Sequence, residues 1–123
     1  MTPSQAYRDT EIREAQTAVI ARMRADPEAA RSTIVTTGRI EAGLTCTVTQ
    51  GRFSAITDLG RAMGGDAAGP SPGFFARVGI VGCVGMGVKM LAAREGLAFE
   101  SVTVTVETDF DDGALMGLGT GSA

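Results

Sequence analysis

The fold of this 123-residue chain is decided by residues 69–106, which read GPSPGFFARVGIVGCVGMGVKMLAAREGLAFESVTVTV. The Ser-Pro pair at 71–72 suits the cap and first positions of a helix, and Gly96 is a typical helix stop. These signals predict a helix over about residues 72–95. Valine then alternates with threonine, which is typical of a half-buried strand and predicts one over residues 101–109.

The predicted helix is unusually rich in glycine, with Gly73, Gly79, Gly82, Gly85 and Gly87 inside it. Each interior glycine costs about 1 kcal/mol relative to alanine, so packing must offset the total. Small residues allow another helix or backbone to approach closely. We therefore expect this helix to be central and heavily buried.

Cys83 lies in the middle of the predicted helix, between Gly79 and Gly87 at i±4, so its face carries no bulky neighbour. One interpretation is a small apolar side chain at a tight helix contact, because free cysteine is often buried. The other is a reactive thiol with room for a substrate beside it. Reactivity requires the thiolate, and a thiol with the unperturbed pKa of about 8.5 is mostly protonated at neutral pH. A reactive Cys83 therefore needs a nearby cation.

The predicted helix does not supply that cation. Arg77 and Lys89 each lie six residues from Cys83, which places them roughly 120° away around the helix. The cation must come from another segment or from a second chain, and the candidates are Arg39, Arg52 and Arg61.

The segments around the helix predict a mixed fold. Residues 1–31 form a helical arm, because apolar residues follow helical spacing until an Asp-Pro pair ends it. The period then changes to two, which predicts an antiparallel meander with strands over about 32–40, 44–49 and 52–57. The Gly/Ala-rich loop 58–70 is of a kind that often carries function. Near the C-terminus, the Asp-Gly pair at 112–113 signals a hairpin with a return strand from about Leu115.

Cys46 alternates with threonines in the second predicted strand. We interpret it as a small core-facing residue. The alternative is a partner thiol for Cys83, which requires the two Cα atoms to lie within about 7 Å.

The amino-acid composition argues against several classes of function. With 11 basic and 14 acidic residues the net charge is −3, which argues against nucleic acid as a partner because phosphate binding needs a basic surface. The absence of histidine excludes a His-based metal site, a Ser–His–Asp triad and a Cys–His dyad. No signal peptide is visible, and the most apolar run, residues 78–88, is shorter than the roughly 20 residues of a spanning helix. We expect a cytoplasmic protein with reduced thiols and no membrane contact.

Residues 64–108, GGDAAGPSPGFFARVGIVGCVGMGVKMLAAREGLAFESVTVTVET, resemble the central stretch of the OsmC/Ohr family. This family comprises osmotically inducible protein C, the organic hydroperoxide resistance proteins and their relatives. The shared features are a Gly-rich loop, the Gly-Pro-Ser-Pro helix start, Cys83, a Gly-Leu helix end and the alternating valine strand. With the preceding meander, the resemblance covers roughly residues 33–118.

The resemblance implies an α+β domain over residues 32–123, in which a β meander accompanies the long central helix. It implies an intertwined homodimer in which both chains contribute to each active site. Active members are thiol-dependent peroxidases, so the resemblance places Cys83 as the thiol that attacks a hydroperoxide and Arg39 as the family arginine that supports it. An external thiol would then act as reductant. No cofactor or metal is implied.

Three departures from the family pattern accompany the resemblance. Gly73 stands where the family has a glutamate, no second cysteine follows Cys83, and most of the family's C-terminal half has no counterpart. We therefore expect a C-terminally shortened relative. The alternative to a peroxidase is a non-catalytic dimer of the same fold that binds a small apolar ligand.

Overall fold

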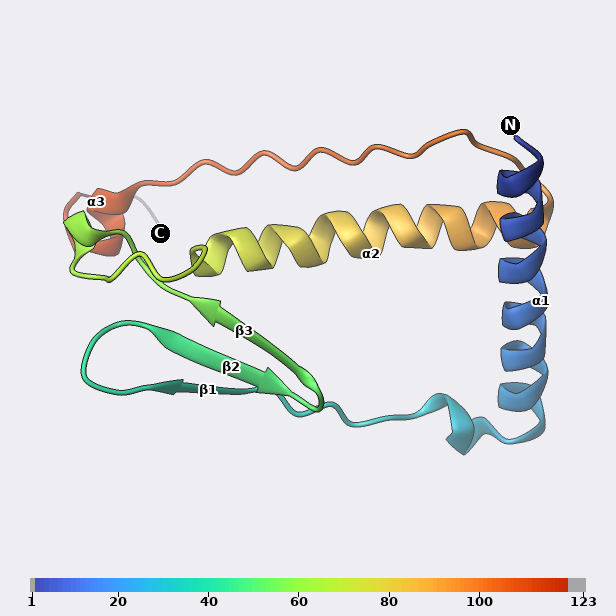
Figure 1. The fold of residues 1–123 in the computed structure, drawn as a ribbon, viewed down its shortest axis with the longest axis horizontal. Coiled ribbons are helices and arrows are strands. Elements are labelled where there is room, and N and C mark those ends of the chain that lie inside the picture. The colour runs from blue at the N-terminus through green and yellow to red at the C-terminus, as the bar shows by residue number, and fades with distance from the viewer. Residues whose placement is uncertain (1, 120–123) are drawn as a thin grey trace.

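The computed structural model describes residues 2–119, and Figure 1 shows its elements in chain order. They are α1 (Pro3–Ala25), the 3₁₀ turn η1 (Pro27–Ala30), the strands β1 (Thr37–Ile40), β2 (Cys46–Gln50) and β3 (Phe53–Thr57), the 3₁₀ turn η2 (Arg61–Met63), and the helices α2 (Pro72–Glu95) and α3 (Asp112–Leu115). The combination of one antiparallel sheet with helices confirms the predicted α+β class.

The N-terminal helix α1 is held by local capping. The Gln5 amide donates to Thr2 Oγ1 at 3.2 Å, while the Thr2 amide donates to Gln5 Oε1 at 2.6 Å. These reciprocal bonds satisfy backbone groups that have no partner within the helix. The helix ends before Asp26, as predicted, and the Asp26 carboxylate then accepts from the Glu28 amide to cap η1.

The three strands form the predicted meander, in the order β1-β2-β3. Val48 lies opposite Gly38 in β1 and Ala55 in β3, which confirms an antiparallel register. The first strand is shorter than predicted, because it begins at Thr37 and not at residue 32. Thr37 pairs with Thr49, and β2 ends one residue later at Gln50. Residues 32–35 therefore have no partner in β2.

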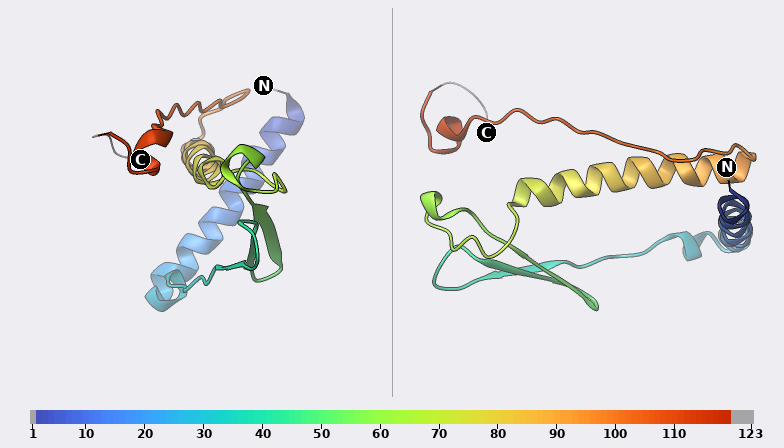
Figure 2. Two further views of the ribbon diagram at one scale, coloured as in Figure 1. Left: turned by 90° about the vertical axis from the view of Figure 1, so that its left-hand side faces the viewer. Right: turned by 45° about the horizontal axis from the view of Figure 1, so that its top comes forward.

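The helix α2 has the predicted bounds. Ser71 Oγ accepts from the Phe74 amide at 3.3 Å, and Gly96 adopts the left-handed conformation with a φ of 73°. The expectation of heavy burial is wrong for the single chain, because Ala92 and Ala93 are its only fully buried residues. The reason is that α1 covers only one end of α2 and the sheet points away from it (Figures 1 and 2).

Residues 101–110 are extended, but the predicted strand does not form. The side chains keep the predicted alternation, with Val102, Val104 and Val106 half-buried. Val104 Cγ2 lies 3.5 Å from the position of a Cβ added at Gly85, so this segment runs along α2 (Figure 2). No backbone ladder pairs it with another described segment. A strand needs such a partner, and one chain does not provide it.

The hairpin predicted at residues 112–113 is also wrong. Asp111 caps the short helix α3, since its side chain accepts from the Ala114 amide at 3.2 Å. An Asp-Gly pair forms a hairpin only between two pairing strands, and the segment before it is unpaired.

A single chain encloses little core. Its accessible surface is 9,465 Å², whereas a compact monomer of 12.6 kDa exposes roughly 6,200 Å². Much of the excess is apolar and belongs to α2, including Phe74, Val78, Ile80, Val84, Met86, Val88, Met90 and Leu91. By length and composition α2 could also cross a membrane, although it contains Arg77 and Lys89.

Candidate functional site

Cys83 lies midway along α2 as an exposed free thiol. The two glycines at i±4 leave its surroundings open, because a Cβ added at Gly79 or Gly87 meets nothing within 4 Å. In the single chain the cysteine is therefore accessible along an unobstructed stripe of the helix. This geometry leaves room for a small substrate beside the sulfur.

The two cations of α2 near Cys83 are engaged elsewhere. Lys89 Nζ lies 3.0 Å from Asp9 Oδ1. Arg77 Nη1 donates to Thr108 Oγ1 at 3.1 Å, and its guanidinium stacks 5.6 Å from the centroid of the Phe110 ring. Both contacts point away from Cys83, which agrees with the helical positions of these residues.

Arg39 lies on β1, in a different part of the molecule from Cys83. Its Nε is 2.9 Å from Glu41 Oε1, and its side chain is 79% exposed. It borders a shallow cavity of about 320 Å³ together with Glu41, Thr47 and Asp66. Because the sheet does not pack on α2, one chain does not bring Arg39 to Cys83.

The other two candidate cations are likewise remote from the thiol. Arg52 stacks on the neighbouring Phe53 ring at 4.9 Å, and Arg61 lies in η2. Neither residue lies on α2 or on a segment that packs along it.

Cys46 is a half-buried free cysteine on β2, so it is not bonded to Cys83. Its sulfur lies 3.0 Å from the position of a Cβ added at Gly38 on the adjacent strand. The absence of a side chain at Gly38 therefore accommodates the sulfur within the sheet. Cys46 is thus half-buried beside Gly38, within a sheet that does not pack on α2.

The space around Gly73 is occupied by Arg77. A Cβ added at Gly73 would lie 3.1 Å from Arg77 Nη1 and 3.4 Å from Phe110 Cζ. Both residues also line an apolar groove of about 560 Å³ between the start of α2 and α3. Residue 73 is thus a glycine without a carboxylate, and the guanidinium of Arg77 lies next to the position that a side chain would occupy.

The sequence analysis did not identify Asp58, whose carboxylate accepts several hydrogen bonds at the start of the Gly/Ala-rich loop 58–70. Its carboxylate accepts from Thr45 Oγ1 at 2.7 Å and from the amides of Leu59, Asp66 and Ala68 at 2.7, 3.3 and 3.2 Å. The residue is only 3% exposed. The Thr45 hydrogen bond, with help from the amides, lowers the pKa of Asp58 below its ordinary value. An aspartate that follows a strand and opens a Gly-rich loop was the only available signal.

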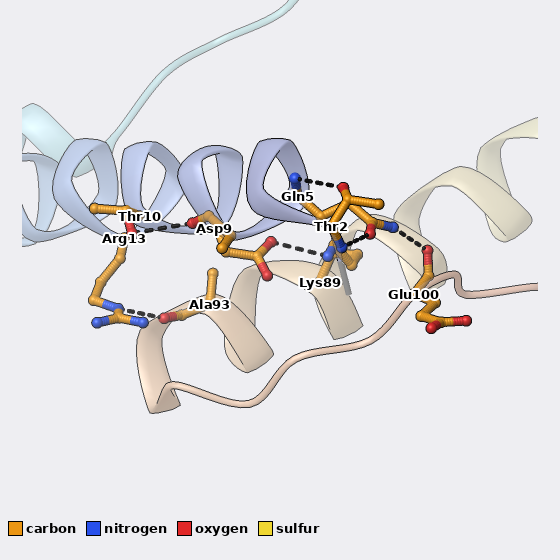
Figure 3. A network of polar contacts seen from close by, with 9 residues as sticks. Thr2, Gln5, Asp9, Thr10, Arg13, Lys89, Ala93 and Glu100 are labelled. Carbon is orange, nitrogen blue, oxygen red and sulfur yellow. Dashed lines mark hydrogen bonds and ion pairs between the residues drawn. The ribbon is translucent and has the colours of Figure 1, made fainter.

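A second polar cluster joins α1 to the end of α2 (Figure 3). Besides the Asp9–Lys89 pair, Arg13 Nε donates to the Ala93 carbonyl at 2.6 Å and Gln5 Nε2 donates to the Glu100 carbonyl at 2.9 Å. A cation near the C-terminal carbonyls of a helix is favourable, because they carry the negative end of its dipole. The cluster docks the arm without contacting Cys83.

No group of three or more potential metal ligands occurs within residues 2–119.

The family comparison covers the part of the chain that contains this thiol. Residues 64–121 match the family of OsmC-like proteins. The matched region contains all of α2, the extended segment and α3. No curated protein matches the chain.

Proposed function

Because residues 64–121 match the family of OsmC-like proteins, we propose that the chain reduces hydroperoxides with Cys83 as the attacking thiol. The observation that carries this proposal is the open thiol on α2, flanked by two glycines whose Cβ positions are unobstructed. A nucleophilic sulfur must be reached along the O–O axis of the peroxide, and bulky residues at i±4 would block that approach.

The proposed reaction is a two-electron oxidation of sulfur. The Cys83 thiolate attacks one peroxide oxygen, an S–O bond forms, and the O–O bond breaks. The leaving alkoxide takes a proton and departs as an alcohol, which leaves a sulfenic acid on Cys83. An external thiol then condenses with the sulfenic acid to give a mixed disulfide and water, and a second thiol releases the reduced enzyme. We place the protein in the cytoplasm, where such thiols are abundant.

We further propose that a second copy of the chain completes the site. One chain exposes about 3,300 Å² more than a compact monomer of its mass. Two copies that cover this excess bury an area typical of obligate homodimers. In such a dimer, Arg39 of one copy lies against Cys83 of the other and stabilises its thiolate.

The test is the consumption of cumene hydroperoxide in the presence of dithiothreitol. We expect turnover by the unmodified chain and by Cys46→Ser, because Cys46 lies in the sheet and not on α2. Cys83→Ser should reduce the rate to that of dithiothreitol alone. Equal rates for Cys83→Ser and the unmodified chain would contradict the proposal.

A second candidate is a non-catalytic dimer that binds a small apolar ligand. It is favoured by the surroundings of residue 73, where a glycine stands and Arg77 and Phe110 are the nearest side chains to its added Cβ. This candidate predicts that Cys83 remains a free thiol after exposure to mild hydroperoxide. Intact-protein mass spectrometry distinguishes the two, because only the peroxidase accumulates a sulfenic or sulfinic adduct at Cys83 when no thiol is supplied.

A further inference from the structure

The end of the sheet is tied directly to the start of α2. The Asp58 amide donates to the Pro70 carbonyl at 3.1 Å, and Thr57 Oγ1 donates to the same carbonyl at 2.8 Å. Pro70 precedes the helix cap Ser71 by one residue. Two hydrogen bonds therefore hold Thr57, the last residue of β3, and the adjacent Asp58 against the residue that leads into α2.

The loop between these points is closed around Asp58. Its carboxylate binds Thr45 at the entrance to β2 and the amides of Asp66 and Ala68 in the loop. The loop also depends on two close approaches, since a Cβ at Gly65 would overlap the Leu59 carbonyl and a Cβ at Gly69 would overlap the Ile56 carbonyl. The turn is thus fixed by a buried carboxylate and by backbone packing.

The loop 58–70 connects two parts of the chain, the sheet and α2, that do not pack on each other. The sheet carries Arg39, α2 carries Cys83, and the two diverge from the loop (Figures 1 and 2). The direction of the sheet relative to α2 therefore depends on the loop and not on a shared core.

We infer that Asp58 and Thr45 are positioning residues that fix the orientation of the sheet relative to α2. The proposed function requires the sheet of one copy to bring Arg39 to Cys83 of the other. The loop held by Asp58 and Thr45 would then determine the position of that arginine. This consequence depends on the proposed function, whereas the orientation itself does not.

A distance measurement tests the orientation directly. Nitroxide labels are attached to Cys83 and to Ser54→Cys on the exposed face of β3, in a Cys46→Ala background of the full chain. Labelled chains are diluted with unlabelled ones, and the distance distribution is measured by double electron–electron resonance. Thr45→Val removes the donor to Asp58 and Thr45→Ser restores a hydroxyl. The control is Thr47→Val on β2, whose cross-strand partner on β3 is Ile56 and not the labelled residue 54.

We expect a narrow distribution for the parent and for Thr47→Val, a broader one for Thr45→Val, and recovery in Thr45→Ser. Circular dichroism confirms that each variant is folded. Thr45→Val is used in place of a change at Asp58 because it leaves the three amide bonds to the Asp58 carboxylate intact. A Thr45→Val distribution that coincides with the parent overturns the inference. A parent without peroxidase activity, but with a broadened distribution in Thr45→Val, would contradict the proposed function and leave the inference standing.

Discussion

Lys89 Nζ lies 3.0 Å from Asp9 Oδ1, and this pair fastens α1 across the end of α2. Asp9 is one of the few buried polar residues of the chain, at 8% exposed. The pair also occupies the charge of Lys89, which is one of the two cations of α2 nearest in sequence to Cys83. The cysteine then depends on a cation from outside its own helix.

Removal of the Asp9 carboxylate is expected to loosen the arm. Asp9→Ala leaves Lys89 partly buried without its partner, which should lower the free energy of unfolding by roughly 1–3 kcal/mol. The matched control is Glu28→Ala, whose pair with Arg31 is exposed on both sides and should contribute less than about 1 kcal/mol. Urea denaturation measures both changes. Equal losses of unfolding free energy in the two variants would show that the Asp9–Lys89 pair stabilises the chain no more than an exposed ion pair does.

The stability of the chain should fall when Asp58 is protonated. Its pKa in the folded state lies below the ordinary value of 3.8, chiefly because Thr45 donates to the carboxylate. The folded state therefore binds fewer protons than the unfolded state, so this contribution is present above the unfolded pKa and is lost as the pH falls through the folded one.

The check compares the unmodified chain with Asp58→Asn in denaturant titrations from neutral pH down to about pH 3. The unmodified chain should be the more stable at neutral pH, and the difference should shrink on acidification. A difference that stays constant below the ordinary pKa would show that ionisation of Asp58 contributes nothing.

Substitution by alanine should have opposite effects on stability at a glycine of the Gly/Ala-rich loop 58–70 and at a glycine of α2. Gly69→Ala forces a Cβ against the Ile56 carbonyl and should destabilise the chain by about 1–3 kcal/mol. Gly79→Ala meets open space in the single chain and should stabilise the helix by about 1 kcal/mol.

The same Gly79→Ala variant reports on the proposed dimer. If a second copy packs closely on this stripe, the added methyl weakens association, although the helix itself is stabilised. Sedimentation equilibrium of Gly79→Ala against the unmodified chain measures the dissociation constant. An unchanged constant would mean that the stripe lies outside the contact between the two copies.

The oligomeric state itself is the next prediction. The exposed apolar surface of α2 should be covered by a second copy, so light scattering should give twice the mass of one chain at micromolar concentration. A monomer that binds phospholipid vesicles would instead mean that lipid covers α2, which has the length and hydropathy of a spanning helix. Vesicle flotation in parallel with light scattering distinguishes the two.

Local signals in the sequence predicted the elements that depend on them. The cap at Ser71 and the stop at Gly96 define α2 correctly, because capping involves only neighbouring residues. The period-two pattern predicted the meander for the same reason, since short turns join its strands.

The features that failed depend on distant partners. Residues 101–109 have the composition of a strand, but a ladder requires a second strand that alternation does not specify. The expected burial of α2 rested on its glycines, and one chain packs only Gly73 and Gly85 closely against other segments. Asp58 was missed because its partners are spread from Thr45 to Ala68.

In the proposed dimer, Cys83 of one copy works with Arg39 of the other, and complementation between two inactive variants is the sharpest test of this pairing. Cys83→Ser and Arg39→Ala chains are assayed for cumene hydroperoxide reduction separately and after co-refolding with each other. We predict little activity in either variant alone and recovered activity in the mixture, because a mixed dimer contains one site with both residues intact. A mixture as inactive as its components, or an Arg39→Ala chain as active as the unmodified one, would rule out the proposed shared site.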